Sequence, residues 1–101
     1  MKNENYPKAS GEVKIKINDN VLPGHYANQI IIMHSHDEFI MDYLAAFPPE
    51  PIVVSRIVMT PGHFKRVLTA MAENLKKYES QHGEIKMATE PVTPSGSNSL
   101  H

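Results

Sequence analysis

His34, His36 and Asp37 are the side chains whose types and spacing best suit metal binding. Two imidazoles separated by one residue on a strand point to the same side, and the carboxylate beside them could share an ion. A catalytic zinc usually takes three protein ligands, so His25 or His63 would have to approach from elsewhere in the fold. We prefer the alternative of a polar hairpin turn. We therefore expect neither a metal site nor another cofactor.

Basic side chains follow the start of a predicted helix. Thr60 can cap free backbone N–H groups there, Pro61 suits the first helical position, and anions are favoured at such a terminus. The candidate contacts for an anion or a partner are Arg56, His63, Lys65 and Arg66. The alternative is capping beside a solvated helix face. We favour this alternative because the chain lacks a glycine-rich loop of the kind that holds phosphate.

Nucleophile arrangements are absent from the sequence. The chain has no cysteine, no serine in a G-x-S-x-G turn and no paired-carboxylate motif in a turn-and-strand frame. We therefore expect a protein that is not an enzyme. Asn28, Asp42, Arg56 and Asn74 stand among apolar residues, which suits either partner contacts or a buried network that ties the strands to the helix. We favour the network.

The composition is that of an ordinary small globular protein. Of 101 residues, 41% are hydrophobic and 21% charged, and the formal net charge of -1 makes nucleic-acid binding a minor hypothesis. The sequence starts without the apolar region of a secretory signal, and no apolar run approaches the roughly 20 residues that span a bilayer. We therefore expect no membrane partner, and the lack of cysteine suits a reducing cytoplasm.

One long amphipathic helix is the clearest element of the sequence. It is predicted from Pro61, after the capping residue Thr60, to a stop at Gly83. Apolar residues recur along it at steps of three and four, which is the period of a helix with one buried stripe. These residues are Phe64, Val67, Leu68, Met71, Leu75 and Tyr78.

Four strands are predicted before this helix, over residues 12–17, 26–35, 38–47 and 52–59. In the first, Val13, Ile15 and Ile17 alternate with two lysines, and the others are rich in β-branched or aromatic residues. Short connections favour antiparallel neighbours, so we expect an α+β fold of order β-β-β-β-α in two layers, with the helix across one sheet face. The predicted domain covers residues 12–86, between disordered ends at residues 1–11 and 87–101.

Both faces of this predicted sheet are apolar, although a single helix can cover only one of them. The residues expected on the uncovered face, and so in an interface, are Ile31, Met33, Ile40, Leu44, Val53 and Ile57. A second copy that presents the same patch is the commonest way to bury such a face. We therefore predict a homodimer or a higher assembly.

The chain resembles a family of small, functionally uncharacterised bacterial and archaeal proteins, domain of unknown function 3467. The resemblance covers roughly residues 12–86, and its most specific block runs from Arg56 to Arg66. It is carried by Tyr26-Ala27-Asn28, Phe39, Asp42, Arg56-Ile57-Val58-Met59-Thr60-Pro61, His63, Lys65, Arg66, Leu68, Asn74 and Tyr78. The family implies no activity. The predicted layout is also similar to that of the export chaperone SecB, which has a further helical segment not found here.

Three functions are consistent with these patterns. The first is a non-enzymatic, homodimeric protein-interaction module. The second is a SecB-like holdase that binds unfolded polypeptides. The third, with the least support, is a metal- or nucleic-acid-binding protein.

Overall fold

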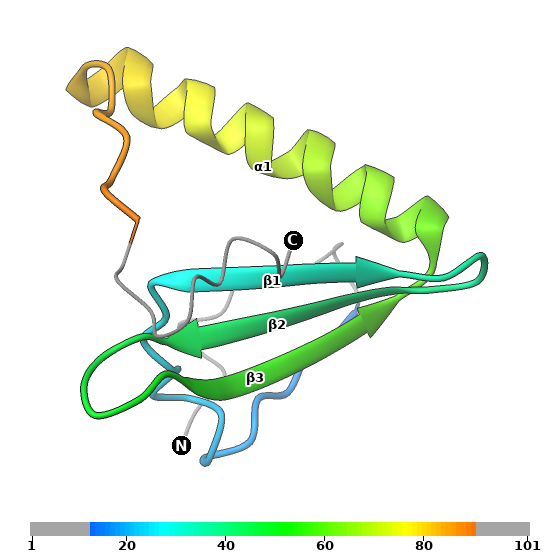
Figure 1. Ribbon diagram of the computed structural model, residues 1–101. Coiled ribbons are helices and arrows are strands. Elements are labelled where there is room, and N and C mark those ends of the chain that lie inside the picture. The colour runs from blue at the N-terminus through cyan, green and yellow to red at the C-terminus, as the bar shows by residue number, and fades with distance from the viewer. Residues whose placement is uncertain (1–12, 91–101) are drawn as a thin grey trace.

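The protein has an α+β fold in which a three-stranded antiparallel sheet is followed by one long C-terminal helix (Figure 1). The structure, a computed structural model, describes residues 13–90. Strand β1 spans Gln29–His34, β2 spans Phe39–Ala45 and β3 spans Ile52–Met59, in the sheet order β1-β2-β3. Helix α1 spans Pro61–His82 and follows β3 with a single residue between them. The predicted order of these elements is confirmed for all but the first strand.

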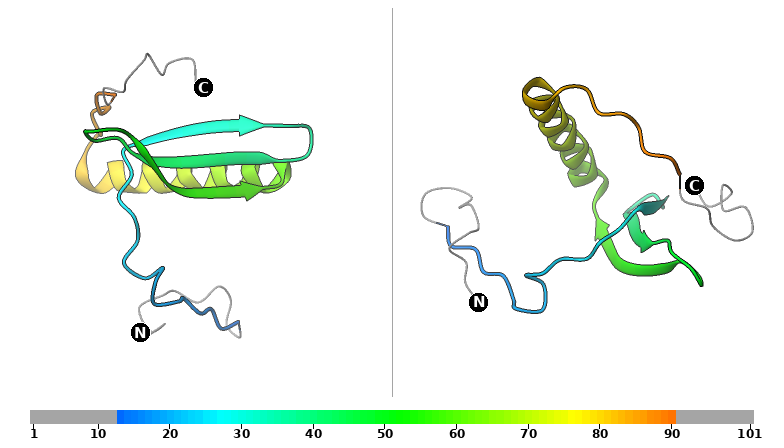
Figure 2. Two further views of the ribbon diagram at one scale, coloured as in Figure 1. Left: turned by 60° about the horizontal axis from the view of Figure 1, so that its bottom comes forward. Right: turned by 90° about the vertical axis from the view of Figure 1, so that its left-hand side faces the viewer.

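The expected fourth strand is wrong as a part of this sheet. Residues 13–18 have the alternating pattern of a strand, but the structure assigns them to none. Alternation describes which side chains could be buried, whereas a strand also needs a neighbour with which to exchange hydrogen bonds. The segment from residue 13 to residue 28 leads away from the sheet in both views of Figure 2. We call it the arm.

Side chains close both ends of the β1–β2 hairpin. At its turn, Ser35 Oγ accepts hydrogen bonds from the backbone N–H groups of Asp37 and Glu38, at 3.2 and 3.3 Å. At the open end, the Asn28 amide oxygen accepts from the Ala46 N–H at 2.7 Å, and the Asn28 N–H donates to the Leu44 carbonyl at 2.9 Å. β1 and β2 are shorter than the predicted ranges 26–35 and 38–47, and these bonds lie just outside their ends.

A bulge in β3 changes which residues share a sheet face. Tyr43 of β2 lies opposite Ser55, whereas the next residue, Leu44, lies opposite Val53, so Val54 is an extra residue in β3. Strict alternation puts Val53 and Ile57 on one face. The bulge instead puts Val53 beside Leu44 and Ile57 beside Met41, on opposite faces of the sheet. The expected grouping of Ile57 with Val53 is therefore corrected.

The two ends of α1 follow the local signals in the sequence. Thr60 Oγ1 accepts a hydrogen bond from the His63 N–H at 3.2 Å, and Pro61 takes the first helical position, where no N–H is needed. At the other end, Gly83 has a φ of 95°, and its N–H donates to the Glu79 carbonyl at 2.9 Å. The predicted start and end of the helix are confirmed.

The core within residues 13–90 is small. Met41, Leu44 and Ala46 are its buried apolar residues, Asp42 is buried beside them, and α1 contributes none. The expected two-layer packing is therefore corrected. α1 starts against the sheet and then lies apart from it, since its axis rises from the end of β3 at an angle to the strands (Figure 1).

The expected disordered ends fall mostly outside the part of the chain that the structure describes. This holds for residues 1–11 and 91–101, whereas residues 83–90 are described and have no regular secondary structure.

Candidate interaction surface

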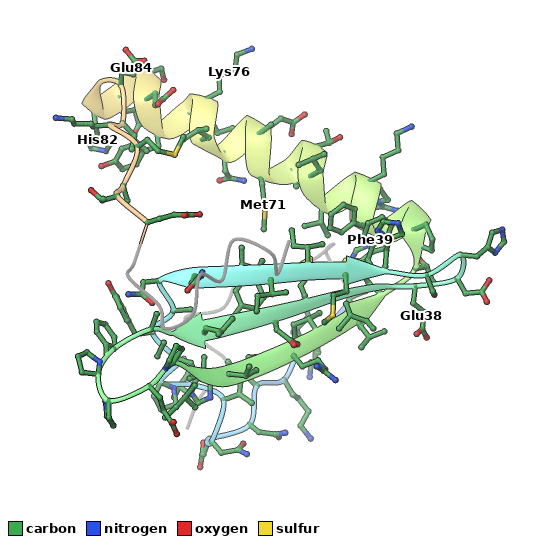
Figure 3. All side chains as sticks on the ribbon, viewed as in Figure 1. Glu38, Phe39, Met71, Lys76, His82 and Glu84 are labelled. Carbon is green, nitrogen blue, oxygen red and sulfur yellow. The ribbon has the colours of Figure 1, made fainter. Side chains whose placement is uncertain are left out.

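The apolar side of α1 is uncovered along most of the helix. Its large side chains remain about half exposed, with Leu68 at 60%, Met71 at 55% and Leu75 at 48%. The α1 stripe, as we call this set, comprises Leu68, Met71, Leu75 and Tyr78. Met71 points from α1 toward the sheet (Figure 3) and remains exposed there. A helix with this pattern normally buries its stripe, so the missing contact is the main anomaly of the fold.

An aromatic contact joins the first turns of α1 to the sheet. The rings of Phe39 and Phe64 are stacked, with centroids 4.0 Å apart and planes 6° from parallel. The His34 ring lies 5.3 Å from Phe39 on the neighbouring strand. This contact identifies the face of Phe39 as the side of the sheet that α1 approaches. It acts as the joint from which the helix departs.

The sheet face on the side of α1 is also incompletely covered. Cross-strand pairing places Ile32 and Ile57 on either side of Met41, which shares the face of Phe39. Met41 is buried, but both isoleucines remain exposed. The α1-side face, as we call it, comprises Ile30, Ile32, Phe39, Met41, Tyr43 and Ile57. The α1 stripe and the α1-side face are thus two exposed apolar surfaces on elements that the Phe39–Phe64 stack joins.

The opposite sheet face holds five of the six residues expected in an interface. Register places Ile31, Met33, Ile40, Leu44 and Val53 there, and Ile57 on the α1-side face. Leu44 is buried within the chain, whereas Met33 and Val53 are exposed. Their role in an interface stays a prediction, with Leu44 available to a partner least of all.

Asp42 and Arg56 form an ion pair across β2 and β3 on that opposite face. The two residues lie directly opposite each other in register. Arg56 Nε donates to Asp42 Oδ1 at 2.7 Å, and Nη2 donates to Oδ2 at 2.8 Å. The carboxylate is almost fully buried, with 6% of its side chain exposed, whereas 59% of the arginine side chain is exposed. The fork geometry makes this a specific pair rather than a loose surface contact.

The pair changes the proton affinity of both partners. Hydrogen bonds from Arg56 lower the pKa of Asp42 below its ordinary value of 3.8, and burial opposes that change only in part. The same bonds raise the pKa of Arg56. Asp42 is thus charged at neutral pH although it is buried. The expected network that ties the strands to the helix is wrong for these four residues, since Asp42 and Arg56 join two strands and Asn74 donates within α1 to the Ala70 carbonyl.

The histidine cluster forms a turn in the structure. His36 Nδ1 lies 3.0 Å from Asp37 Oδ1 at the exposed hairpin tip, while the His34 ring packs on Phe39. Across residues 13–90, no three His, Cys, Asp or Glu side chains come together in a way that could hold a metal ion. The residues expected as possible ligands are therefore near in sequence without forming a common site.

The basic residues at the start of α1 lie in solvent. His63, Lys65 and Arg66 are all exposed, and the first turn of the helix has no acidic residue. Thr60 already caps the N–H of His63. Arg56 lies on the sheet and is held by Asp42. The four residues expected to contact an anion or partner are therefore divided between two separate places.

The arm carries apolar side chains that pattern analysis did not single out. Val21, Leu22 and Tyr26 are exposed, although they lie among turn residues. Tyr26 contacts one residue of the β2–β3 connection, where its ring stacks on Phe47 with centroids 5.9 Å apart. The sequence does contain a signal for this surface. Val21 and Leu22 directly precede Pro23 and Gly24, and two large apolar residues are unusual in a turn that faces solvent.

Comparison with known proteins identifies the family of the chain. The model of the family described as "Protein of unknown function (DUF3467)" matches residues 1–87. The chain belongs to this family. No curated protein and no solved structure matches it, so DUF3467 membership gives kinship without an activity, and the SecB-like layout has no structural neighbour in its support. In residues 13–90 of this DUF3467 protein, no helix is long and apolar enough to cross a membrane.

Proposed function

We propose that this DUF3467 protein is a non-enzymatic, homodimeric protein-interaction module. The observation that carries the proposal is the exposed α1 stripe, because a 22-residue helix with no buried residue is left without apolar cover by its own chain beyond the Phe39–Phe64 stack. A second copy supplies an identical stripe. Under two-fold symmetry the same patch meets itself, which makes the stripe self-complementary without any other partner.

Magnitudes indicate how much surface the dimer must bury. Full burial of a Leu or Met side chain contributes roughly 1.5–3 kcal/mol, so covering the exposed half of each contributes about 1 kcal/mol. Four stripe residues on each of two copies then give about 8 kcal/mol, within the roughly 4–15 kcal/mol that association costs. The stripe alone therefore gives a weak dimer. A stable one also covers Ile32 and Ile57 of the α1-side face, both of which are exposed.

This requirement favours one arrangement of the two copies. The α1 stripe and the α1-side face diverge from the Phe39–Phe64 joint. A helix from the second copy that enters between them touches both surfaces at once, and the reciprocal contact follows by symmetry. The opposite sheet face, with the Asp42–Arg56 pair among exposed Met33 and Val53, then stays available for another protein. An arginine within an apolar patch is typical of such contacts.

We include the cytoplasm as the place of action in this proposal. Its support is a sequence without cysteine, which suits a reducing compartment.

A pair of helix variants tests the proposal. Met71→Asp places a charge in the stripe, whereas Thr69→Asp makes the same change of charge on the solvated side of α1. Light scattering after size exclusion is expected to give a dimer for the wild type and for Thr69→Asp. Met71→Asp is expected to give a monomer or unfolded chain, because a charge cannot be buried in the interface without a partner. A Met71→Asp variant that stays a stable dimer contradicts the proposal.

A SecB-like holdase is the second candidate, favoured by the same exposed apolar surface and by its methionines Met33 and Met71. Flexible thioethers adapt to clients of different shape. Suppression of the aggregation of a denatured test protein separates the two functions. The holdase requires suppression by the wild type and a weaker effect of Met71→Asp, whereas the interaction module requires none at equal concentrations.

A further inference from the structure

The two edge strands of the sheet differ in how well they are protected against pairing. β1 and β3 are the edges, and no strand within residues 13–90 pairs with the outer side of either. β3 carries Arg56 and a bulge, both of which discourage unwanted pairing. β1 reads QIIIMH, and it has no lysine, no proline and no bulge. Such an edge is a ready template for another strand.

The arm carries a segment that fits this edge. Val13 and Ile15 alternate with Lys14 and Lys16, so one side of the segment is apolar and the other is charged. The structure assigns the segment to no strand, and Val13 is 49% exposed. Pattern analysis predicted a strand here, and the sheet lacks one strand on its unprotected edge. A segment with a strand pattern but no sheet and a sheet edge with no neighbouring strand are therefore complementary.

The arm is folded locally although it packs little on its own sheet. The Val21 and Leu22 N–H groups both donate to the Asn18 carbonyl, at 2.9 and 3.0 Å, and Gly24 turns the chain with a φ of 78°. Val21, Leu22 and Tyr26 are nevertheless exposed. Apolar side chains on a turned segment that leaves its own domain are typical of an element exchanged between copies.

We propose that the arm of one copy packs on a second copy, where residues 13–16 add a strand to the free edge of β1. By symmetry each copy gives its arm and receives one, so two three-stranded sheets become two four-stranded sheets. Main-chain hydrogen bonds give the affinity, as in other cases of strand addition. Val13 and Ile15 lie on the apolar sheet, and the two lysines stay in solvent and protect the new edge.

The connecting chain is long enough for this exchange. Residues 17–28 span at most about 43 Å when fully extended, at roughly 3.3–3.6 Å per residue, and less while the turn from Asn18 to Gly24 is kept. Strands in a sheet lie about 4.8 Å apart, so three strands are about 10 Å wide from the first to the last. An arm that starts at β1 can therefore reach the corresponding edge of a copy packed against α1. The proposal rests on the homodimer of the proposed function.

Paramagnetic broadening between chains tests the exchange directly. The chain has no native cysteine, so Lys14→Cys provides one attachment point for a nitroxide on the charged side of the segment. Spin-labelled chain without ¹⁵N is mixed with unlabelled ¹⁵N chain, and the dimers are allowed to exchange partners. The amides of Gln29–His34 in the ¹⁵N chain are expected to lose the most intensity, and the loss is expected to decrease across the sheet from β1 to β3. Nitroxide on Glu84→Cys, at the far end of α1, serves as the control.

A second variant separates loss of the strand from loss of the dimer. Ile15→Pro, added to the labelled chain, removes a donor from the ladder and is expected to abolish the broadening at β1 while the helix-mediated dimer persists. A dimer in which the β1 amides of the ¹⁵N chain keep their intensity overturns the exchange and leaves the homodimer intact. A wild-type chain that is monomeric overturns the homodimer, and the exchange with it.

Discussion

Asp42 and Arg56 show how one pair of residues ties two strands together and makes the fold sensitive to acid. The carboxylate is buried and charged because two hydrogen bonds from the guanidinium hold its pKa below 3.8. A carboxyl whose pKa is lower in the folded state stabilises the fold above its unfolded pKa. That contribution is lost as the pH falls through the folded pKa. The raised pKa of Arg56 has no effect at the pH values where the protein is handled, because arginine stays charged there.

Replacing Asp42 by asparagine should reduce this acid sensitivity. Asp42→Asn keeps the side-chain shape and removes the charge. The wild type is expected to lose more free energy of unfolding than the variant between about pH 6 and about pH 3, because only the wild type must protonate a carboxylate that is ion-paired when folded. Urea unfolding at both pH values measures the difference. The other carboxylates are common to both proteins and cancel, so equal losses contradict the assigned role of the pair.

Asp42 and Arg56 each stand out in the sequence, but nothing in the sequence shows that they contact each other. Asp42 and Arg56 were noticeable as polar residues within apolar strands. Their contact depends on the register of β2 and β3, and that register depends on the bulge at Val54. A bulge adds one residue without a composition signal of its own. Side-chain faces beyond it, such as that of Ile57, could therefore not be predicted from strict alternation.

At the scale of elements, the Phe39–Phe64 stack determines where α1 leaves the sheet. It is the ring contact between helix and strand in the described residues, and every apolar residue of the α1 stripe lies beyond it. An aromatic pair in this geometry contributes about 1 kcal/mol beyond the area that it buries. The joint is thus strong enough to align the start of α1 and too small to hold its remaining turns.

A double-mutant cycle measures this joint. Phe39→Leu and Phe64→Leu each keep an apolar side chain and remove one ring of the stack. The two changes are expected to be non-additive by about 1 kcal/mol in the free energy of unfolding, because either one alone already removes the ring contact. Urea unfolding of the four proteins gives the coupling. Additivity within error means that the helix is anchored elsewhere.

The bounds of an element could be predicted from the sequence where the residues that start and end it lie within or next to that element. Thr60-Pro61, the apolar stripe and Gly83 determine α1 from within its own sequence, and the bounds of β3 follow from its β-branched run before Thr60. The expected strand near Val13 lacks this property. Its pattern is suitable for pairing, but the neighbour that would make it a strand is not in its own sheet. The pattern of one segment carries no signal for the strand that it would pair with.

At the scale of the whole molecule, one chain leaves many of its large apolar side chains exposed to solvent. Residues 13–90 bury the apolar side chains of Met41, Leu44 and Ala46, while the α1 stripe, the α1-side face and the arm all leave large apolar side chains exposed. Small domains have little stability to spare, and the proposed homodimer would cover this surface. The two apolar sheet faces predict a partner from the sequence alone. The structure adds the helix stripe and the arm as surfaces of the same kind.

The molar mass of the wild-type chain in solution is the most direct test of this account. Light scattering after size exclusion, at about micromolar concentration, is expected to give twice the chain mass of 11.3 kDa, together with a cooperative unfolding transition that moves to higher denaturant as protein concentration rises. A mass of 11.3 kDa for a chain that unfolds cooperatively, with a transition independent of concentration, would contradict the account.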